Sequence, residues 1–484
     1  MDFLSTPFDD DKLREECGIF GVYNHESAAA LVALGLHALQ HRGQEACGII
    51  SSNGQKLFAR HELGLVSDTF ANENIIDQLH GAHAIGHVRY ATTGETARRN
   101  IQPLMAEMAF GSFAVAHNGN LTNALTIRQT LVKQGSIFQS STDTETIIHL
   151  MATHQNSSVV DRLIASLNQI EGAYSLICLT DDAMIGVRDP YGVRPLMLGK
   201  LDDSFVLASE SCALDIIGAT YVRDVEPGEL VVISQTGLQS FTPFQKKPHR
   251  FCVFEYIYFA RPDSMVEGRS VYAIRKAIGR ELAIEAPVDA DMVVPVPDSG
   301  VPSAIGFAQQ IGLPFDLGII RNHYVGRTFI EPTDRIRHLG VKLKHNPNRS
   351  YIQGKRVILV DDSIVRGTTS KKIVEMVRAA GARQVHMRIS SPPTRHSCFY
   401  GIDTPEKEKL LAHIHSVDDM AKLIGVDSLA FISLDGLYRA TGEAMRNTNA
   451  PQFCDACFSG DYPIALTDMT TCQTSAALPL KRLA

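Results

Sequence analysis

The second half of this 484-residue sequence takes its expected architecture from one stretch, Val357-Ile-Leu-Val-Asp-Asp-Ser-Ile-Val-Arg-Gly-Thr-Thr-Ser370. Four apolar residues predict a buried strand, and an acidic pair ends it. The Ser, Gly and Thr loop that follows opens a helix pattern, so backbone N–H groups and hydroxyls gather at a helix N-terminus that suits a phosphate. Two carboxylates would repel a phosphate unless they bind something else. Sugar hydroxyls or a bridging divalent cation are the available partners. The stretch therefore predicts a site for a phosphorylated sugar with a metal.

Strand and helix patterns alternate around this stretch. They predict strands at residues 292–296, 315–320, 357–360 and 385–389 and helices at residues 271–285, 302–311 and 371–380. Such alternation predicts a parallel, doubly wound sheet, which binds ligands at the carboxyl ends of its strands. A second strand-to-loop junction, Val293-Val-Pro-Val-Pro-Asp-Ser-Gly300, lies at that edge.

The first half is richer in strand patterns, from Cys17 to about residue 240. Asn53-Gly54 signals a hairpin, and helical spacing recurs at residues 28–40, 144–153 and 160–170. Two sheets with helices packed on them would form a layered α+β domain. We place this domain at residues 17–241, a polar linker at 242–250, the second domain at 251–464 and a C-terminal tail at 465–484.

Composition excludes several classes of protein. A net charge of −7 with 44% hydrophobic residues argues against a nucleic-acid binder. No apolar run is long enough for a membrane helix, and the acidic start lacks the pattern of a signal peptide, so we expect a cytoplasmic protein. The nine cysteines are an odd number scattered over a long chain, which favours thiols for chemistry or metal binding over a disulfide framework.

The acid pair and its loop resemble the phosphoribosyl-diphosphate motif of the type I phosphoribosyltransferases. The resemblance implies that Asp361 and Asp362 hold the ribose hydroxyls and that the loop from Ser363 cradles the 5-phosphate. It also implies that the upstream junction contacts pyrophosphate and that Mg²⁺ is held by Ser299 and the two aspartates. The implied binding residues are Asp298, Ser299, Gly300, Asp361, Asp362, Ser363, Arg366, Gly367, Thr368 and Thr369.

A polar, basic segment with a central glycine, Arg321-Asn-His-Tyr-Val-Gly-Arg-Thr-Phe-Ile330, resembles the flexible hood of these enzymes. Tyr324 and Arg327 are its candidate contacts. Closure of a hood would exclude water, which would otherwise capture a ribosyl oxocarbenium-like centre.

Five motifs in the first half resemble the class II glutamine amidotransferases. They are Cys17-Gly-Ile-Phe-Gly, His41-Arg-Gly-Gln44, His87-Val-Arg-Tyr-Ala-Thr-Thr93, His117-Asn-Gly-Asn120 and Ser141-Thr-Asp-Thr-Glu145. The resemblance implies the αββα sandwich of the N-terminal nucleophile hydrolases, with Cys17 as nucleophile and Asn118 and Gly119 as the oxyanion hole. Arg89 can hold the α-carboxylate of glutamine, and Asp143 its ammonium group.

Cys17 needs a base that the sequence around it does not provide. An internal thiol with a pKa near 8.5 is mostly protonated at neutral pH, whereas a freed α-amino group of pKa about 8 would lie within reach of the sulfur. We therefore predict that residues 1–16 are a propeptide, removed after Glu16 from a zymogen. Cys47 is interpreted as a small buried residue, and Cys178 and Cys212 as core residues.

Cys454 and Cys457 have a metal or redox spacing, and Cys252 and Cys398 complete a set of four. From spacing alone, zinc is at least as plausible as iron. The sequence around these cysteines is similar to the iron–sulfur branch of the amidophosphoribosyltransferases, which implies a [4Fe-4S] cluster.

Both halves together resemble the amidophosphoribosyltransferase family of glycosyltransferases. The resemblance implies that ammonia from glutamine passes inside the protein to 5-phosphoribosyl 1-diphosphate, giving 5-phosphoribosylamine at the first step of purine synthesis. We also expect purine nucleotide inhibitors and a homo-oligomer. Two alternatives stay open at this point: a class II glutamine amidotransferase with another acceptor, and a phosphoribosyl-diphosphate-binding regulator without catalysis.

Overall fold

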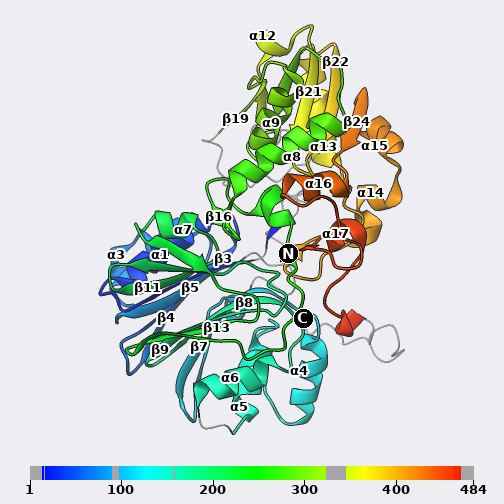
Figure 1. Ribbon diagram of the computed structural model, residues 1–484. Coiled ribbons are helices and arrows are strands. Elements are labelled where there is room, and N and C mark those ends of the chain that lie inside the picture. The colour runs from blue at the N-terminus through cyan, green and yellow to red at the C-terminus, as the bar shows by residue number, and fades with distance from the viewer. Residues whose placement is uncertain (1–13, 16, 90–96, 156–157, 323–344, 470–484) are drawn as a thin grey trace.

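A computed structural model describes residues 14–15, 17–89, 97–155, 158–322 and 345–469. Two strand-and-helix parts meet along one face, the first in blue to green and the second in green to red (Figure 1). Among the described helices, none combines the length and apolar content needed to cross a bilayer.

Two antiparallel sheets stack on each other in the first part. The seven-stranded sheet has the order β12 (Thr220–Asp224), β10 (Met197–Leu201), β11 (Ser204–Ala208), β2 (Cys17–Tyr23), β5 (His83–Arg89), β3 (Ala46–Ser52) and β4 (Leu57–Leu63). The six-stranded sheet has the order β14 (Gly237–Phe241), β13 (Leu230–Ser234), β9 (Ala183–Arg188), β8 (Gly172–Thr180), β7 (Gly111–Leu121) and β6 (Leu104–Met108).

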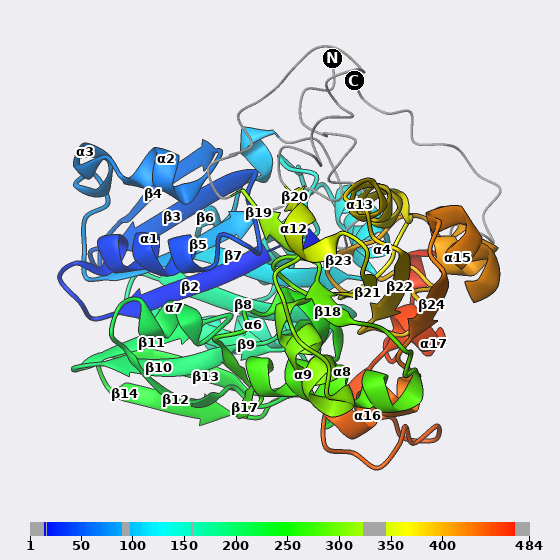
Figure 2. The ribbon, with the colours of Figure 1, turned by 90° about the horizontal axis from the view of Figure 1, so that it is seen from above.

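Helices cover the outer face of each sheet, which gives four αββα layers, seen from the side in Figure 1 and from above, with α1 in front of the strands, in Figure 2. The seven-stranded sheet carries α1 (Ala28–Ala38), α2 (Val66–Phe70), α3 (Glu73–Ile76) and α7 (Cys212–Asp215), and the six-stranded sheet carries α4 (Ala124–Lys133), α5 (Glu145–Thr153) and α6 (Val159–Leu167).

The alternation along β2 explains this layering. Phe20 and Val22 pack among the residues of α1, whereas Ile19 and Tyr23 pack between the two sheets. Successive side chains of a strand point to opposite faces, so a strand that is apolar on both faces is buried between two layers. The expected sandwich is confirmed, and the Asn53-Gly54 hairpin joins β3 to β4 in the predicted place.

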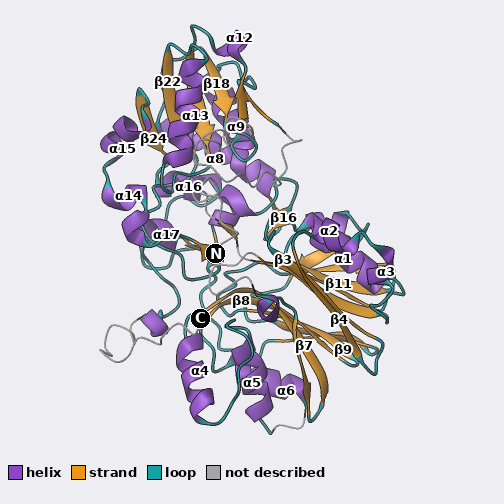
Figure 3. Cartoon of the chain, turned by 180° about the vertical axis from the view of Figure 1, so that it is seen from behind, coloured by secondary structure: helices purple, strands orange, loops and turns teal. Residues whose placement is uncertain are grey.

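A parallel sheet with helices on both faces forms the second part (Figure 3). Its order is β18 (Met292–Pro295), β21 (Arg356–Asp361), β22 (Gln384–Ile389) and β24 (Ser428–Phe431). One face packs on α8 (Val271–Glu285) and α9 (Val301–Ile311), and the other on α13 (Thr368–Ala379) and α15 (Val417–Ile424). The predicted doubly wound arrangement is therefore correct.

The strand predicted at residues 315–320 is wrong in extent. Phe315 makes one isolated parallel bridge to Val293, and only β19 (Ile319–Arg321) is a strand, paired with β20 (His345–Pro347) outside the main sheet. Gly318 lies so close to Val294 that a Cβ there would be 2.7 Å from a valine methyl group. The chain thus pairs briefly with the edge of the sheet at Val293 and then leaves it.

Short elements complete the structure. They are β1 (Arg14–Glu15), η1 (Arg98–Asn100), β15 (Phe251–Cys252), η2 (Glu255–Phe259), β16 (Met265–Val266), β17 (Arg269–Ser270), α12 (Arg349–Ile352), β23 (Ile402–Asp403), η3 (Lys407–Lys409), α14 (Leu411–Ile414), α16 (Leu434–Ala440), β25 (Phe453–Cys454) and α17 (Ala456–Ser459). Residues 242–250, all described, hold neither helix nor strand. The domain boundaries themselves stay a prediction.

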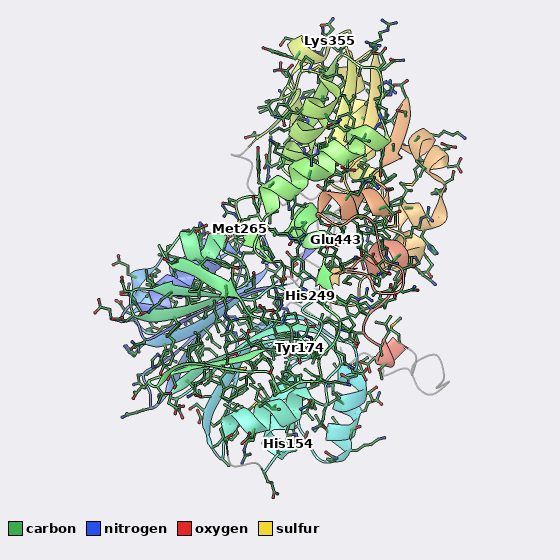
Figure 4. All side chains as sticks on the ribbon, in the orientation of Figure 1. His154, Tyr174, His249, Met265, Lys355 and Glu443 are labelled. Atoms are coloured by element: carbon green, nitrogen blue, oxygen red, sulfur yellow. The ribbon has the colours of Figure 1, made fainter. Side chains whose placement is uncertain are left out.

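Buried charges join the two parts. Glu255, in η2 of the second part, accepts from Arg42 at 2.7 Å and from Arg194 at 2.9 Å, and all three side chains are fully buried. Nearby, the backbone N–H of Met265 donates to Ser211 at 2.8 Å, and Figure 4 labels Met265 at this junction. A buried carboxylate needs such partners, because unpaired charge in a dry interior is strongly unfavourable.

Replacing Glu255 with alanine should therefore destabilise the protein by ~3–5 kcal/mol, because Arg194 and Arg42 each lose a buried carboxylate, although Arg42 still pairs with Glu210. The free energy of unfolding, measured in urea, checks this. Asp263→Ala is the matched control, since it removes a 2.6 Å ion pair with Arg261 that is about half exposed and should cost at most ~1 kcal/mol. Equal losses for both variants would contradict the role given to Glu255.

Candidate active sites

Cys17 begins strand β2 and lies beside Arg89, its partner in the ladder to β5. Both side chains are buried, with 6% and 7% of their surface exposed. The nucleophile and the carboxylate-binding arginine expected from the sequence are thus neighbours at one end of the seven-stranded sheet.

Asn118 and Gly119 occupy the corresponding end of β7 in the other sheet. The Asn118 side chain is fully buried, and neither its amide nitrogen nor its oxygen has a hydrogen-bond partner among the described residues. Leaving a buried amide without a hydrogen bond reduces stability by about 1–3 kcal/mol, so such a group in a native structure calls for an explanation. An oxyanion that forms only during reaction would give the amide N–H its partner.

Gly119 has no room for a side chain. Its φ is +142°, and a Cβ would lie 2.0 Å from the carbonyl oxygen of Ala173. The backbone at the expected oxyanion hole therefore requires glycine.

A hydrogen bond between the sheets brings these ends together. His87 Nε2 lies 3.1 Å from the carbonyl oxygen of His117, one residue before Asn118 and across the sandwich from β5. Burial first, and the charge of Arg89 next, lower the pKa of His87 to about 3. His87 is therefore neutral at physiological pH and donates this bond from Nε2.

Asp143 follows a loop that closes over the same end. Its carboxylate accepts from the N–H groups of Leu121 at 2.9 Å and Thr144 at 2.8 Å. Burial raises the pKa of Asp143, but the charge of His117 and these hydrogen bonds outweigh burial and lower it. A carboxylate that stays ionised can bind the ammonium group of an amino acid.

Two polar residues that the sequence did not single out support this site. Asn100 accepts from Arg89 Nη1 at 2.6 Å through its carbonyl oxygen and bonds Ser141 with its side chain at 2.9 Å. Gln102 accepts from the N–H of His117 at 2.8 Å. They join Arg89 to the Asp143 loop, and nothing in their local sequence signals this because the partners are distant in the chain.

The other first-half cysteines are not nucleophile candidates. Burial raises the pKa of Cys47 to about 12, and it is fully buried. Cys178 and Cys212 are also buried, with pKa values raised by burial. The interpretation of these three as packing residues is confirmed.

The acid pair of the second part lies at the carboxyl end of β21, as predicted. Asp361 and Asp362 are 2% and 1% exposed. Asp362 accepts from the hydroxyl of Ser363 at 2.6 Å and from that of Ser299, which arrives from the end of the neighbouring strand β18. The structure therefore brings the two predicted loops together at one sheet edge.

Gly367 turns the chain into helix α13 with a φ of +80°. Thr368 and Thr369 are the first helical residues, and the first-turn N–H groups of a helix have no partner within it, so this turn can bind phosphate. Gly300 also immediately precedes a helix, α9, but with an ordinary φ of −73°. Tyr324 and Arg327, the predicted hood contacts, lie outside the described residues, while Arg321 at the start of that segment pairs with Asp298.

The four cysteines expected to bind iron lie together. Cys252 and Cys454 are ladder partners between β15 and β25. Burial first, and then the charges of the other cysteines, raise the pKa of Cys454 and Cys457 well above the ordinary value. Among the described residues, no group of three or more His, Cys, Asp or Glu side chains is arranged around a point that would hold one metal ion.

Comparison with known proteins agrees with both halves. A family model described as a glutamine amidotransferase domain matches residues 87–215, and one described as a phosphoribosyl transferase domain matches residues 269–397. An amidophosphoribosyltransferase of Rhizobium etli is 56% identical, covering 96% of this chain and 94% of its own, and one of Bacillus subtilis is 48% identical, covering 93% and 94%.

A solved structure gives the same result. The glutamine phosphoribosylpyrophosphate amidotransferase of B. subtilis complexed with ADP and GMP superposes with a TM-score of 0.88 at 47% identity, covering 93% of this chain and 98% of that one. A second, described as the allosteric regulatory enzyme of purine biosynthesis, has a TM-score of 0.89 at 47% identity and covers 93% and 97%.

The buried neutral His87 should make stability depend on pH. Its pKa is lower in the folded chain, about 3, than the ~6.5 of an unfolded histidine, so the unfolded chain binds the extra proton. Stability is lost as pH falls below about 6.5, by up to ~1.4 kcal/mol per pH unit from this residue. The His87→Gln variant can still donate to the His117 carbonyl. Its free energy of unfolding should fall less steeply with falling pH than that of the wild type.

Urea unfolding between about pH 7 and pH 5 measures this slope. His37→Gln, on the exposed side of α1, is the control and should keep the wild-type slope. An unchanged slope for His87→Gln would show that His87 is not the group responsible.

Proposed function

The chain belongs to the amidophosphoribosyltransferase family, and from this premise we propose how its residues divide the reaction. The activity is glutamine-dependent amination of 5-phosphoribosyl 1-diphosphate, the first step of purine biosynthesis. The proposal is carried by one observation: the buried, unpartnered amide of Asn118 at the end of the sandwich where Cys17 and Arg89 lie.

Glutamine hydrolysis belongs to the first part. Arg89 binds the α-carboxylate and Asp143 the ammonium group, which leaves the side-chain amide facing Cys17. The sulfur attacks the amide carbon while the oxygen takes negative charge against the Asn118 amide and the Gly119 N–H. Collapse releases ammonia and leaves a thioester, and water then releases glutamate and restores the thiol. The freed α-amino group of Cys17 carries the proton between these steps.

Transfer belongs to the second part. The loop 363–369 holds the 5-phosphate, Asp361 and Asp362 hold the ribose hydroxyls, and Asp298, Ser299 and Gly300 contact the diphosphate. Ammonia bonds to C1 as the bond from C1 to the diphosphate oxygen breaks, so pyrophosphate leaves and the new amine loses a proton. The oxygen donors of Ser299, Asp361 and Asp362 suit Mg²⁺, which would neutralise charge on the leaving pyrophosphate.

Ammonia must reach C1 without entering bulk water. At neutral pH most free ammonia is protonated, and ammonium is not a nucleophile. We therefore place its route inside the protein, with the hood segment that carries Tyr324 and Arg327 closing before glutamine is hydrolysed.

A [4Fe-4S] cluster on Cys252, Cys398, Cys454 and Cys457 is our proposal for the four neighbouring thiols. Each thiolate of such a cluster binds a different iron, whereas zinc needs all four on one ion. Burial first, and then the charges of Cys252, Cys398 and Cys454, raise the pKa of Cys457, which fits four thiols near enough to share one cluster. The N–H of Tyr400 donates to Cys398 Sγ at 3.3 Å, a bond that favours the thiolate.

Further properties follow by likeness to the relatives. The related structure binds ADP and GMP, and we propose that purine nucleotides inhibit this chain as well. We also propose that the chain forms a homo-oligomer, lies in the cytoplasm and loses residues 1–16. The phosphoribosyl transferase domain sets the chain apart from class II amidotransferases with other acceptors, and a binding-only regulator would have no use for the Cys17 site.

Cys17→Ala should abolish glutamine-dependent release of pyrophosphate but leave release driven by added ammonium salt within about twofold of wild type, because the second site stays intact. Wild-type enzyme, checked by mass spectrometry, should begin at Cys17. Loss of both activities in the variant would contradict separate sites, and full activity in a chain that keeps residues 1–16 would contradict an N-terminal nucleophile.

Protein purified without oxygen should contain about four iron atoms and four acid-labile sulfides per chain and be brown. Cys454→Ser should lose this iron. Cys472→Ser replaces a cysteine outside the proposed set and should keep it. Colourless anaerobic protein that contains zinc instead would refute the cluster.

A further inference from the structure

We propose that a loop of the second part, residues 398–401, positions the oxyanion hole of the first part. This inference rests on the proposed roles of Asn118 and Gly119. It adds Asn120 and Gly401 as positioning residues, which act through those two and do not touch glutamine. Three sets of contacts support it.

The first contact is between two glycines. Gly401, buried and with a φ of +102°, faces Gly119 so closely that a Cβ on Gly401 would lie 2.9 Å from Gly119 Cα and 3.2 Å from its carbonyl carbon. The carbonyl of Ala173 closes the other side of Gly119. The oxyanion glycine is therefore held between the backbone of its own sheet and the backbone of the second part.

The second contact is a hydrogen bond. Asn120 Nδ2 donates to the carbonyl oxygen of Phe399 at 2.9 Å. Asn118, two residues earlier, has no partner for its own amide in the described structure. The residue after the oxyanion glycine is thus tied to the loop, while the residue before it is left for substrate.

The third set holds the loop and the end of β7 together. Tyr400 Oη donates to the carbonyl oxygen of Ile464 at 2.6 Å. A few residues on, Asp468 donates from its N–H to the Thr122 carbonyl at 3.0 Å and accepts from the N–H groups of Leu125 and Thr126 at 2.8 and 3.0 Å. In Figure 1 this red segment descends from α17 to α4. Loop and C-terminal segment therefore pack on β7 as one unit.

These contacts should affect turnover more than binding. An oxyanion donor acts on charge that develops in the transition state, and a displacement of about 1 Å can cost 100-fold. Arg89 and Asp143, which bind the ground state of glutamine, are held by residues of the first part. Disturbing the loop should therefore lower kcat for glutamine hydrolysis and leave KM nearly unchanged.

Gly401→Ala tests the glycine contact in the full-length enzyme. We expect kcat for glutamine hydrolysis to fall roughly 10- to 100-fold, KM for glutamine to stay within about twofold, and ammonium-driven pyrophosphate release to stay within about twofold. Gly425→Ala is the matched control, because Gly425 also has a positive φ, +86°, but open space where the Cβ would lie. It carries the same backbone strain without touching Gly119.

Asn120→Asp tests the hydrogen bond, since a carboxylate cannot donate to the Phe399 carbonyl. The expected change is a fall in kcat with KM preserved. Asn123→Asp is its control: Asn123 Nδ2 makes an equivalent 3.0 Å bond, but to Gln169 within the first part. Iron content and unfolding midpoint, measured for every variant, show whether the fold and the second part are intact.

Asn118→Ala distinguishes the oxyanion role proposed for Asn118 from the positioning role proposed for the loop 398–401. A large loss of kcat in Asn118→Ala with wild-type kcat in Gly401→Ala and Asn120→Asp would overturn the inference and leave the oxyanion hole standing. Wild-type kcat in Asn118→Ala would overturn the oxyanion assignment itself. Equal losses in the test variants and their controls would also overturn the inference, because general destabilisation would then explain them.

Discussion

The carboxylate of Glu255, fully buried between Arg42 and Arg194, fixes how the two parts meet. A buried carboxylate without partners is strongly unfavourable, so this junction requires both guanidinium groups to be held in place. Arg42 lies in a loop that packs on Arg89: the N–H of Glu45 donates to the Arg89 carbonyl at 3.0 Å. One buried ion cluster therefore sets both the junction between the parts and the backbone of the glutamine site.

Most of the fold could be predicted from local sequence. The strand patterns that begin at Cys17 and the helical spacings between them indicated two sheets with helices packed on them, and the acid pair after Val360 marked the end of a parallel strand correctly. The strand predicted at residues 315–320 was wrong in extent because pairing with the main sheet stops at Phe315 while Leu317 and Ile320 are exposed, and an apolar run does not show where pairing ends. Exposed or short strands such as β12 and β14 carried too weak a pattern.

The candidate sites divide in the same way. Cys17, Arg89 and Asn118 could be singled out because each belongs to a short motif that resembles those of the class II glutamine amidotransferases. Asn100, Gln102 and Gly401 could not, because an asparagine, a glutamine or a glycine is ordinary in a loop. Their roles depend on contacts with residues that are distant in the sequence: Gly401 contacts Gly119, which lies 282 positions earlier in the chain. The sequence from residue 465 on was predicted only as a tail, yet Asp468 accepts a hydrogen bond from the N–H of Leu125 in α4.

The small strand β1 has a consequence for the fate of the N-terminal segment. Arg14 and Glu15 pair with Asp403 and Ile402, immediately after Gly401. Among the residues described before Cys17, these two form the pairing, so excision of residues 1–16 would uncover a two-residue edge at Ile402 and Asp403, too short to recruit another chain. Because β1 pairs next to Gly401, loss of this strand would change the surroundings of the loop that lies against Gly119.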